Sequence, residues 1–227
     1  MIQNGAKLAE DIQEIQVKSA ERVREHGEVL TAQREVQAML DLVKNESERI
    51  DSRFLEPACG DGNFLVAILE RKLKTVYDRY KSKKADFEIY MISAVSSIYG
   101  IDLLADNIEE SKQRMLDMCL ACYKKALKKS ADEEYQNILK FILDKNIVQG
   151  DSLNGIDKII FTEWALVGDY KVSRAEYSFS QMNQQAEILN TPLFASLTND
   201  KGEDVFLPNP VKTYPVCYFR KILEVTK

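Results

Sequence analysis

The chain has 227 residues, of which 45% are hydrophobic and 30% charged, and its formal net charge at pH 7 is −5. This composition is ordinary for a globular protein with one sizeable domain and a small appendage. The acidic balance excludes a surface that binds nucleic acid over its whole area, so DNA binding would need a local basic patch or a partner.

Segments with helical periodicity alternate with short apolar runs over the first two thirds of the chain. Predicted helices cover 6–25, 33–44, 63–80, 105–129 and 131–144, and predicted strands cover 53–57, 98–102 and 146–151. Strands that alternate with helices predict an α/β fold with a doubly wound, mostly parallel sheet, preceded by an N-terminal helical segment.

The pattern weakens from residue 156 onward. A short strand is predicted at 159–161 and a half-exposed strand at 170–179, and residues 180–190 are typical of a short helix. The tail from Thr191 contains four of the five prolines and is predicted to be irregular. Trp164 is interpreted as a core or lid aromatic, with base stacking as the alternative.

A glycine turn, Gly60-Asp61-Gly62, separates the first predicted strand from the helix that follows it. Open parallel sheets bind ligands beyond the carboxyl ends of their strands. Glycines there would let the backbone approach a ligand and would point helix N–H groups at it. A plain strand–helix turn is the alternative. Leu65 excludes a full G-x-G-x-x-G, and the absence of G-K-[ST] excludes a P-loop.

The next two predicted strands each end in an acid. Asp102 would accept hydrogen bonds from ribose hydroxyls, and Asp151 would accept one from an adenine amino group. These residues suit a nucleoside with a neutral or positive tail. They suit a pyrophosphate less well, because Glu56 and Asp61 would repel phosphates. Helix N-capping is the alternative role for both strand-end acids.

Four stretches of the chain carry a family resemblance, and they occur in the same order as in that family. They are HGEVLT (26–31), FLEPACGDGNFL (54–65), YGIDLLADNIEESKQRM (99–115) and NIVQGDSL (146–153). Together they resemble the S-adenosylmethionine-dependent DNA methyltransferases of restriction–modification systems, of the adenine-N6 kind. The resemblance implies a Rossmann-like methyltransferase fold, the cofactor S-adenosyl-L-methionine, and DNA as a partner, reached directly or through a restriction or specificity subunit.

The resemblance also assigns cofactor-binding roles by position. Thr31 would touch the methionine end, Asp102 would hold the ribose, and Asp151 would bind the adenine amino group. The amino-acid moiety would be lined by Glu56, Ala58, Gly60 and Gly62, and the adenine would pack against Leu103 and Leu153. The chain then divides into an N-terminal helical segment (1–50), a Rossmann-like cofactor-binding core (51–155) and a divergent C-terminal extension (156–227).

The family's catalytic element, [DNS]-P-P-[YFW], does not follow the third predicted strand. A flipped adenine needs acceptors for its amino group and an aromatic ring to stack on. The nearest similar sequence, Leu207-Pro208-Asn209-Pro210-Val211, comes later and has no aromatic at its end. No catalytic residue is therefore assigned.

Three functions stay open. The first is an adenine-specific DNA methyltransferase or its modification subunit. The second is a catalytically inactive companion or regulatory module that binds the cofactor. The third is a methyltransferase that acts on RNA, protein or a small molecule.

The cysteines give no metal-site pattern. Cys119 and Cys122 have C-x-x-C spacing but no second pair of ligands, so buried free thiols are expected. The chain has no apolar signal core and no run of about 20 apolar residues, so we expect a cytoplasmic, reduced protein. Basic clusters at 71–84 and 124–129 are interpreted as solvated helix faces, with a DNA-binding patch as the alternative.

Overall fold

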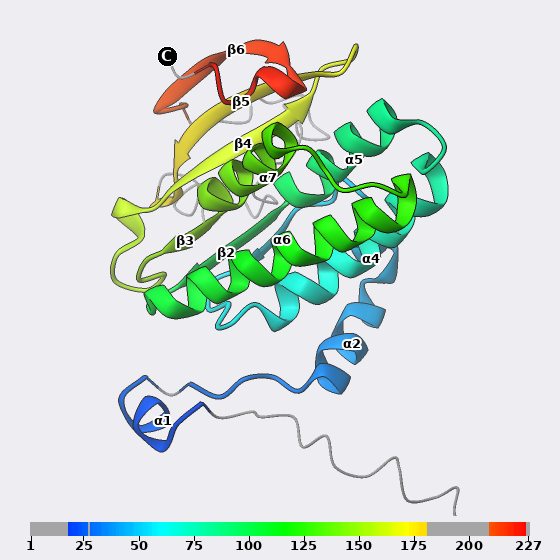
Figure 1. Ribbon diagram of the computed structural model, residues 1–227. Helices are drawn as coiled ribbons and strands as arrows, with labels where there is room; N and C mark the ends of the chain where they lie inside the picture. The colour runs from blue at the N-terminus through cyan, green and yellow to red at the C-terminus, as the bar shows by residue number, and fades with distance from the viewer. Residues whose placement is uncertain (1–17, 27, 181–208, 226–227) are drawn as a thin grey trace, which may run out of the picture.

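The computed structural model describes residues 18–26, 28–180 and 209–225 (Figure 1). The helices are α1 (Ala20–His26), α2 (Gln33–Leu42), α3 (Lys44–Glu48), α4 (Asn63–Tyr80), α5 (Lys84–Ser96), α6 (Ala105–Leu127) and α7 (Glu133–Asn146). The strands are β1 (Phe54–Glu56), β2 (Ile98–Asp102), β3 (Ile147–Gln149), β4 (Ile160–Leu166), β5 (Lys171–Ser178) and β6 (Lys212–Tyr218). Two short 3-10 helices are η1 (Ile156–Lys158) and η2 (Phe219–Lys221). Within the described ranges, no helix is long and apolar enough to cross a membrane.

The first sheet is parallel, with the strand order β1-β2-β3. Phe54 lies opposite Ile98, and Gly100 lies opposite Ile147. The central strand β2 is buried along its length up to Asp102, which is half-buried at the carboxyl end. The expectation of an α/β fold with a parallel sheet is confirmed.

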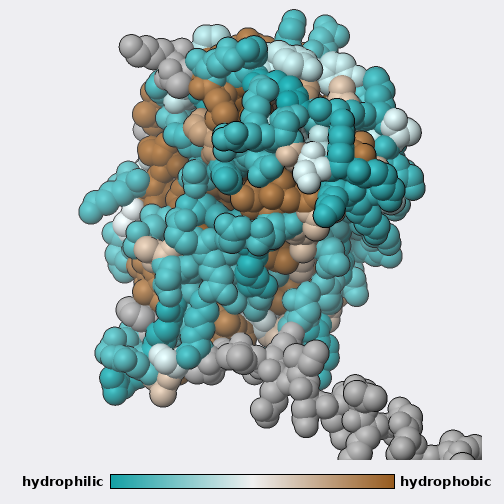
Figure 2. Space-filling view, in the orientation of Figure 1, coloured by the Kyte–Doolittle hydropathy of each residue, from teal (hydrophilic) through white to brown (hydrophobic). Residues whose placement is uncertain are grey.

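Helices α4 and α6 pack against each other and against one face of this sheet (Figure 1). Gly100 makes the close packing possible, because a Cβ there would lie 2.8 Å from Leu65 Cδ1 and 3.1 Å from Cys59 Sγ. Leu65 and Leu69 of α4 and Met115 of α6 are buried in the resulting core. Figure 2 shows hydrophilic side chains over the outer surface of this layer, with apolar side chains visible between them.

The other face of the parallel sheet carries a second core cluster. Tyr99 and Ile101 of β2 pack there with Ile159, Phe161 and Phe179. The Phe161 ring lies edge-on to those of Tyr99 and Phe179, with centroid distances of 5.3 and 5.4 Å. Strand β2 therefore supplies side chains to both cores, and the first residues of β4 cover the second face.

The second sheet is antiparallel, with the order β4-β5-β6, and it lies at the opposite end of the molecule from α1 (Figure 1). Two buried hydrogen bonds join it to the rest of the fold. The Tyr99 hydroxyl donates to the Thr162 carbonyl, and Trp164 Nε1 donates to Asn146 Oδ1, each over 2.9 Å. The interpretation of Trp164 as a core aromatic is confirmed, since it is only 7% exposed.

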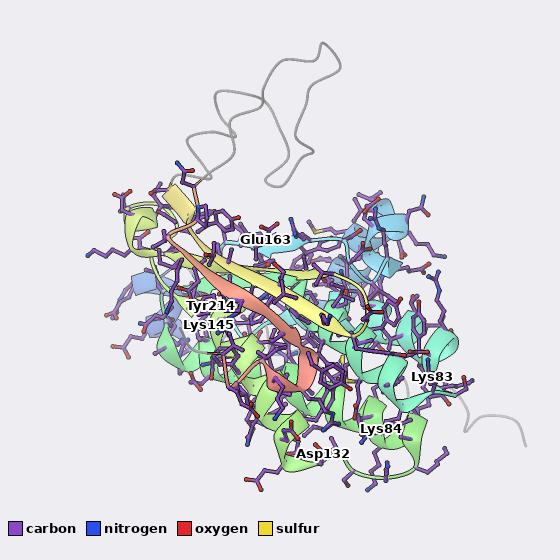
Figure 3. All side chains as sticks on the ribbon, turned by 90° about the horizontal axis from the view of Figure 1, so that it is seen from above. Lys83, Lys84, Asp132, Lys145, Glu163 and Tyr214 are labelled. Atoms are coloured by element: carbon purple, nitrogen blue, oxygen red, sulfur yellow. The ribbon has the colours of Figure 1, made fainter. Side chains whose placement is uncertain are left out.

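Strand β6 forms one edge of the antiparallel sheet. Pro215 lies in this strand, within a register shift against β5. On the side that faces α7, Lys145 and Tyr214 both donate to Glu176 Oε1, over 3.1 and 2.9 Å (Figure 3). These bonds hold β5, β6 and α7 together.

Several predicted elements have the expected bounds, one helix was not predicted, and one predicted irregular segment contains a strand. The helix at 63–80 and the strand at 98–102 are as predicted. Helix α5 is missing from the predicted elements, because it is buried on nearly all sides and so lacks an amphipathic period. The prediction of an irregular tail from Thr191 is wrong for residues 212–218, which form β6. The predicted helix at 180–190 and most of the one at 6–25 lie outside the described residues.

The basic cluster at 71–84 is only partly solvated. Lys72 is fully buried, so the interpretation of this cluster as a solvated helix face is wrong for that residue. Its Nζ donates to the carbonyl oxygens of Ile50 and Ser52 and to Ser97 Oγ. The lysines of the second cluster, Lys124, Lys125, Lys128 and Lys129, are exposed, as expected.

Candidate functional site

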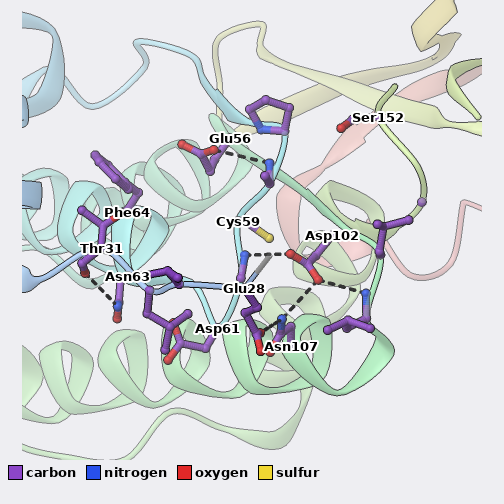
Figure 4. Close-up of a pocket in the computed structure, with 18 of the residues that line it drawn as sticks. Glu28, Thr31, Glu56, Cys59, Asp61, Asn63, Phe64, Asp102, Asn107 and Ser152 are labelled. Carbon is purple, nitrogen blue, oxygen red and sulfur yellow. Dashed lines mark hydrogen bonds between the residues drawn. The ribbon is translucent and has the colours of Figure 1, made fainter. Parts of the chain in front are cut away.

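A cavity of about 310 Å³ lies beyond the carboxyl ends of the three parallel strands (Figure 4). Segments from four parts of the chain line it. They are residues 28–31, residues 56–61 with 63 and 64, residues 102–104 with 107, and residues 150–153. This is the edge of an open parallel sheet at which ligands bind, and the volume is at the lower end of the range for small-molecule sites.

Eight of the nine candidate residues from the sequence line this one cavity. They are Thr31, Glu56, Ala58, Gly60, Asp102, Leu103, Asp151 and Leu153. Gly62 is not among the lining residues and instead lies behind the turn, at the N-cap of α4. Leu103 and Leu153 are 54% and 84% exposed, so they present apolar surface at the mouth of the cavity.

The glycine turn needs its glycines for two separate reasons. Gly60 and Gly62 have φ values of +53° and +91°, which residues with a Cβ rarely adopt. A Cβ on Gly60 would lie 3.2 Å from Leu30 Cδ2, and one on Gly62 would lie 2.7 Å from Ser111 Oγ. The turn is therefore sandwiched between residues 28–31 and helix α6.

Helix α6 clamps the turn with two side chains. Ser111 Oγ donates to the Gly60 carbonyl over 3.0 Å. Arg114 Nη1 donates to the Asp61 carbonyl over 2.7 Å, and Arg114 Nη2 donates to Asn63 Oδ1 over 2.9 Å. These bonds hold the turn, in which Gly60 and Gly62 have left-handed φ values, against α6.

Asp102 ties the end of β2 to the glycine turn. Its Oδ2 accepts the Gly60 N–H over 2.9 Å, and its Oδ1 accepts the Leu104 N–H over 2.9 Å and Asn107 Nδ2 over 3.2 Å. Leu104, not Asp102, is the N-cap residue of α6. Asp102 therefore bonds to the N-cap residue itself and does not cap α6 in the usual manner, through the N–H of the second or third helical residue. A carboxylate has about four acceptor sites, so one remains for a ligand hydroxyl.

Asp151 stabilises the turn in which it lies. Its Oδ1 accepts the N–H groups of Leu153 and Asn154, over 2.8 and 2.9 Å. These bonds lower the pKa of Asp151, so the carboxylate stays charged at neutral pH. Asn154 Nδ2 donates to Oδ2 over 3.2 Å, which leaves one acceptor site on that oxygen.

The cavity wall is strongly acidic. Its carboxylates are Glu28, Glu56, Asp61, Asp102 and Asp151, and no lysine or arginine is among the described residues that line it. Burial raises the pKa of Glu56 and of Asp61. For Glu28, burial acts in the same direction, but hydrogen bonds from Arg22 and Asn107 outweigh it and lower the pKa. A cation with hydrogen-bond donors would be attracted to this wall, and a phosphate would be repelled.

One acceptor in the wall has no donor. Asp61 Oδ1 is buried and has no hydrogen-bond partner among the described residues, whereas Oδ2 lies 3.2 Å from Arg114 Nη1. A buried acceptor without a donor is costly. Burial without a donor destabilises the charged form of Asp61, in keeping with its raised pKa.

The sequence interpretation did not identify several residues that build the site. Glu28 and Asn107 line the cavity, and Ser111, Arg114 and Asn63 hold the glycine turn. The spacing of residues 107, 111 and 114 was the available signal, because it places three polar side chains on one face of α6 next to the strand-end acid.

Among the described residues, no group of three or more His, Cys, Asp and Glu side chains is arranged to hold a metal ion.

No protein-family model matches the chain, and searches of curated proteins and of solved structures likewise give no significant match.

Proposed function

We propose that the chain is an S-adenosyl-L-methionine-dependent DNA methyltransferase of the adenine-N6 kind, or the modification subunit of a restriction–modification system, built on a Rossmann-like methyltransferase fold. One observation carries the proposal. The four stretches that resemble this family are separated by up to about 120 residues of chain, yet they line a single cavity at the carboxyl edge of the parallel sheet.

The acidic wall fits the cofactor better than it fits a phosphate-bearing nucleotide. S-adenosyl-L-methionine carries two positive charges, on its sulfonium and its ammonium groups, and supplies an activated methyl group. The carboxyl groups of Glu56 and Asp61, which both line the cavity, suit the ammonium. The first turn of α4, which begins at Asn63, offers N–H groups to the carboxylate.

The remaining residues suit the nucleoside. Asp102 and Asp151 each keep an acceptor site, for the ribose and for the adenine amino group respectively. Leu103 and Leu153 offer their exposed apolar side chains to the adenine ring. In this proposal, the chain's own residues bind and orient the cofactor, and the residues that hold the target base are not assigned.

A second candidate, a companion subunit that binds the cofactor without transferring methyl groups alone, is favoured by the segment after β3. In place of a [DNS]-P-P-[YFW] loop, the chain forms η1 and then β4. Phe161, the first aromatic residue of this segment, is 2% exposed and belongs to the second core. It is therefore not available to stack on a base. The base-holding groups would then come from a partner chain.

Asp102→Ala should weaken binding of S-adenosyl-L-methionine by about 1–3 kcal/mol, because charge-assisted hydrogen bonds are lost. Calorimetry on the full chain measures this. Asp144→Ala is the control, since Asp144 is an exposed aspartate that pairs with Lys112 on α6 and does not line the cavity. Equal affinities for the wild type and Asp102→Ala would place the ligand elsewhere.

Transfer of a labelled methyl group to unmethylated bacterial DNA separates the two candidates. Transfer by the chain alone would establish the enzyme. Cofactor binding without transfer would favour the companion subunit. A chain that binds no cofactor would refute both.

A further inference from the structure

Asn107 bonds to both sides of the cavity at once. Its Nδ2 donates to Glu28 Oε1 over 2.6 Å and to Asp102 Oδ1 over 3.2 Å. Its Oδ1 accepts from Lys18 Nζ over 2.8 Å and from Arg22 Nη2 over 3.0 Å. The residue is only 1% exposed, and both of its amide N–H groups and its carbonyl are in use. A single buried amide therefore links the strand-end acid to residues about 80 positions earlier in the chain.

The residues that Asn107 holds belong to a strap, which we define as residues 18–26 and 28–31. Helix α1 in this strap stands apart from the helical layer (Figure 1). Ion pairs attach the strap to the first turns of α6, from Lys18 to Glu110 and from Arg22 to Asp106. Arg22 also pairs with Glu28 inside the strap.

The other end of the strap forms part of the cavity wall. Residues 28–31 line the cavity, and Leu30 lies over Gly60. Asn63 Nδ2 donates to the Thr31 carbonyl over 3.2 Å. Closing the cavity on this side thus depends on keeping the strap in place.

Removing the Asn107 amide would leave two carboxylates facing each other. The Glu28 side chain is 8% exposed, and Asp102 is held by the glycine turn, so neither can turn freely to water. The Nδ2 group is the donor that both share. Without it, their repulsion would push the strap away from the end of β2.

We infer that Asn107 is a positioning residue that fastens the strap over the cavity, so that strap closure and ligand binding form one coupled equilibrium. The identity of the ligand rests on the proposed function, whereas the fastening itself does not. If only the closed form binds well, the apparent dissociation constant rises in proportion as the closed fraction falls. Because the strap is held largely by ion pairs, added salt should open it.

Asn107→Asp tests the fastening. This variant has the same shape and keeps an acceptor for Lys18 and Arg22, but it loses the donor to Glu28 and Asp102. Hydrogen exchange of the hydrogen-bonded strap amides of Val23 and Glu28, measured on the full chain without ligand, should accelerate by at least about tenfold. The dissociation constant for S-adenosyl-L-methionine should rise by a similar factor. In the wild type, it should also rise between about 0.05 and about 0.5 M NaCl.

Two further variants separate positioning from general damage. Lys112→Gln changes another residue of α6 and removes its ion pairs with Glu109 and with Asp144 of α7. This variant should leave exchange of the Val23 and Glu28 amides unchanged. Adding Glu28→Gln to Asn107→Asp restores a donor–acceptor pair in the reverse direction. This double variant should exchange more slowly than Asn107→Asp alone, which a merely structural defect would not produce.

Unchanged exchange in a folded Asn107→Asp variant would overturn the inference. Faster exchange with unchanged affinity would overturn the coupling. Should this variant not fold, Arg22→Gln, at a half-buried position of the strap, gives the same two readouts. Faster exchange in a chain whose wild type binds no S-adenosyl-L-methionine would uphold the fastening and refute only the proposed function.

Discussion

Lys72 shows how far a single residue can depart from its sequence neighbours. It lies on α4 between Arg71 and Leu73, in a run that looks like a solvated basic face. Its ammonium group nevertheless reaches three neutral oxygens in the interior, from Ile50, Ser52 and Ser97. These bonds join α4 to the residues before β1 and before β2. Burial lowers the pKa of Lys72 to about 7, so the group titrates in the neutral range.

This pKa predicts a specific pH dependence of stability. In the unfolded chain, the pKa of a lysine is about 10.4, so between pH 7 and that value the unfolded state binds more protons than the folded state. The contribution of Lys72 to the free energy of unfolding therefore becomes more favourable as pH rises. The Lys72→Met variant has no titratable group at this position, so it lacks this pH-dependent contribution to the free energy of unfolding. Relative to the variant, the wild type should gain about 2 kcal/mol between pH 7 and pH 9.

Urea unfolding at several pH values measures the difference. Lys74→Met is the control, because Lys74 is exposed on the same helix, and its difference from the wild type should not change with pH. Parallel pH profiles for the wild type and Lys72→Met would show that the buried ammonium keeps an ordinary pKa.

At the scale of elements, the strand–turn–helix unit from β1 to α4 is the part that the sequence predicts best. Local signals decide it: an apolar strand, two glycines with positive φ and an uninterrupted helical period. Helix α5 escapes prediction because its burial on nearly all sides leaves no polar face. Strand β6 is not predicted because its pairing partner, β5, comes about 40 residues earlier and Pro215 suggests a loop.

The same difference between local signals and distant contacts applies to the residues of the candidate site. Residues at strand ends or in the glycine turn, such as Asp102 and Gly60, are recognisable from local pattern alone. Glu28 and Asn107 are not, because their roles depend on contacts between segments about 80 residues apart. Periodicity carries no information about such contacts.

Gly62→Ala should destabilise the fold by about 2–3 kcal/mol, through backbone strain at φ +91° and through contact with Ser111. Gly168→Ala is a matched control, since Gly168 has a φ of +85° but no atom lies within 4 Å of the position that its Cβ would take. Gly168→Ala should lower the free energy of unfolding only through backbone strain, by about 1 kcal/mol. Equal losses in thermal unfolding would mean that Ser111 moves aside without cost.

At the scale of the whole molecule, the antiparallel sheet lies at the end opposite helix α1 (Figure 1). The end with the antiparallel sheet is held by the C-terminal segment, in which Phe219 is fully buried. Arg220 pairs with Glu88 and Asp132, over 2.6 and 3.0 Å. The parallel sheet is covered on one face by helices and on the other by Ile159, Phe161 and Phe179, and β2 contributes side chains to both cores.

Strand β6 has a further consequence for solubility. It ends the strand order of the antiparallel sheet, and its outer edge pairs with no strand in the part of the chain that the structure describes. Open edges can recruit strands from other molecules, and a proline on such an edge removes a backbone donor. Pro215 would then hinder the pairing of β6 with strands of other molecules.

Pro215→Val should therefore raise light scattering as protein concentration increases, whereas Thr213→Val, an exposed change in the same strand that adds no donor, should not. A Pro215→Val chain that stays monodisperse at all concentrations would mean that the edge is protected by other means. In that role, Pro215 has two effects. It makes the sequence of β6 resemble a loop, and it lets the antiparallel sheet end at β6 without pairing to other molecules.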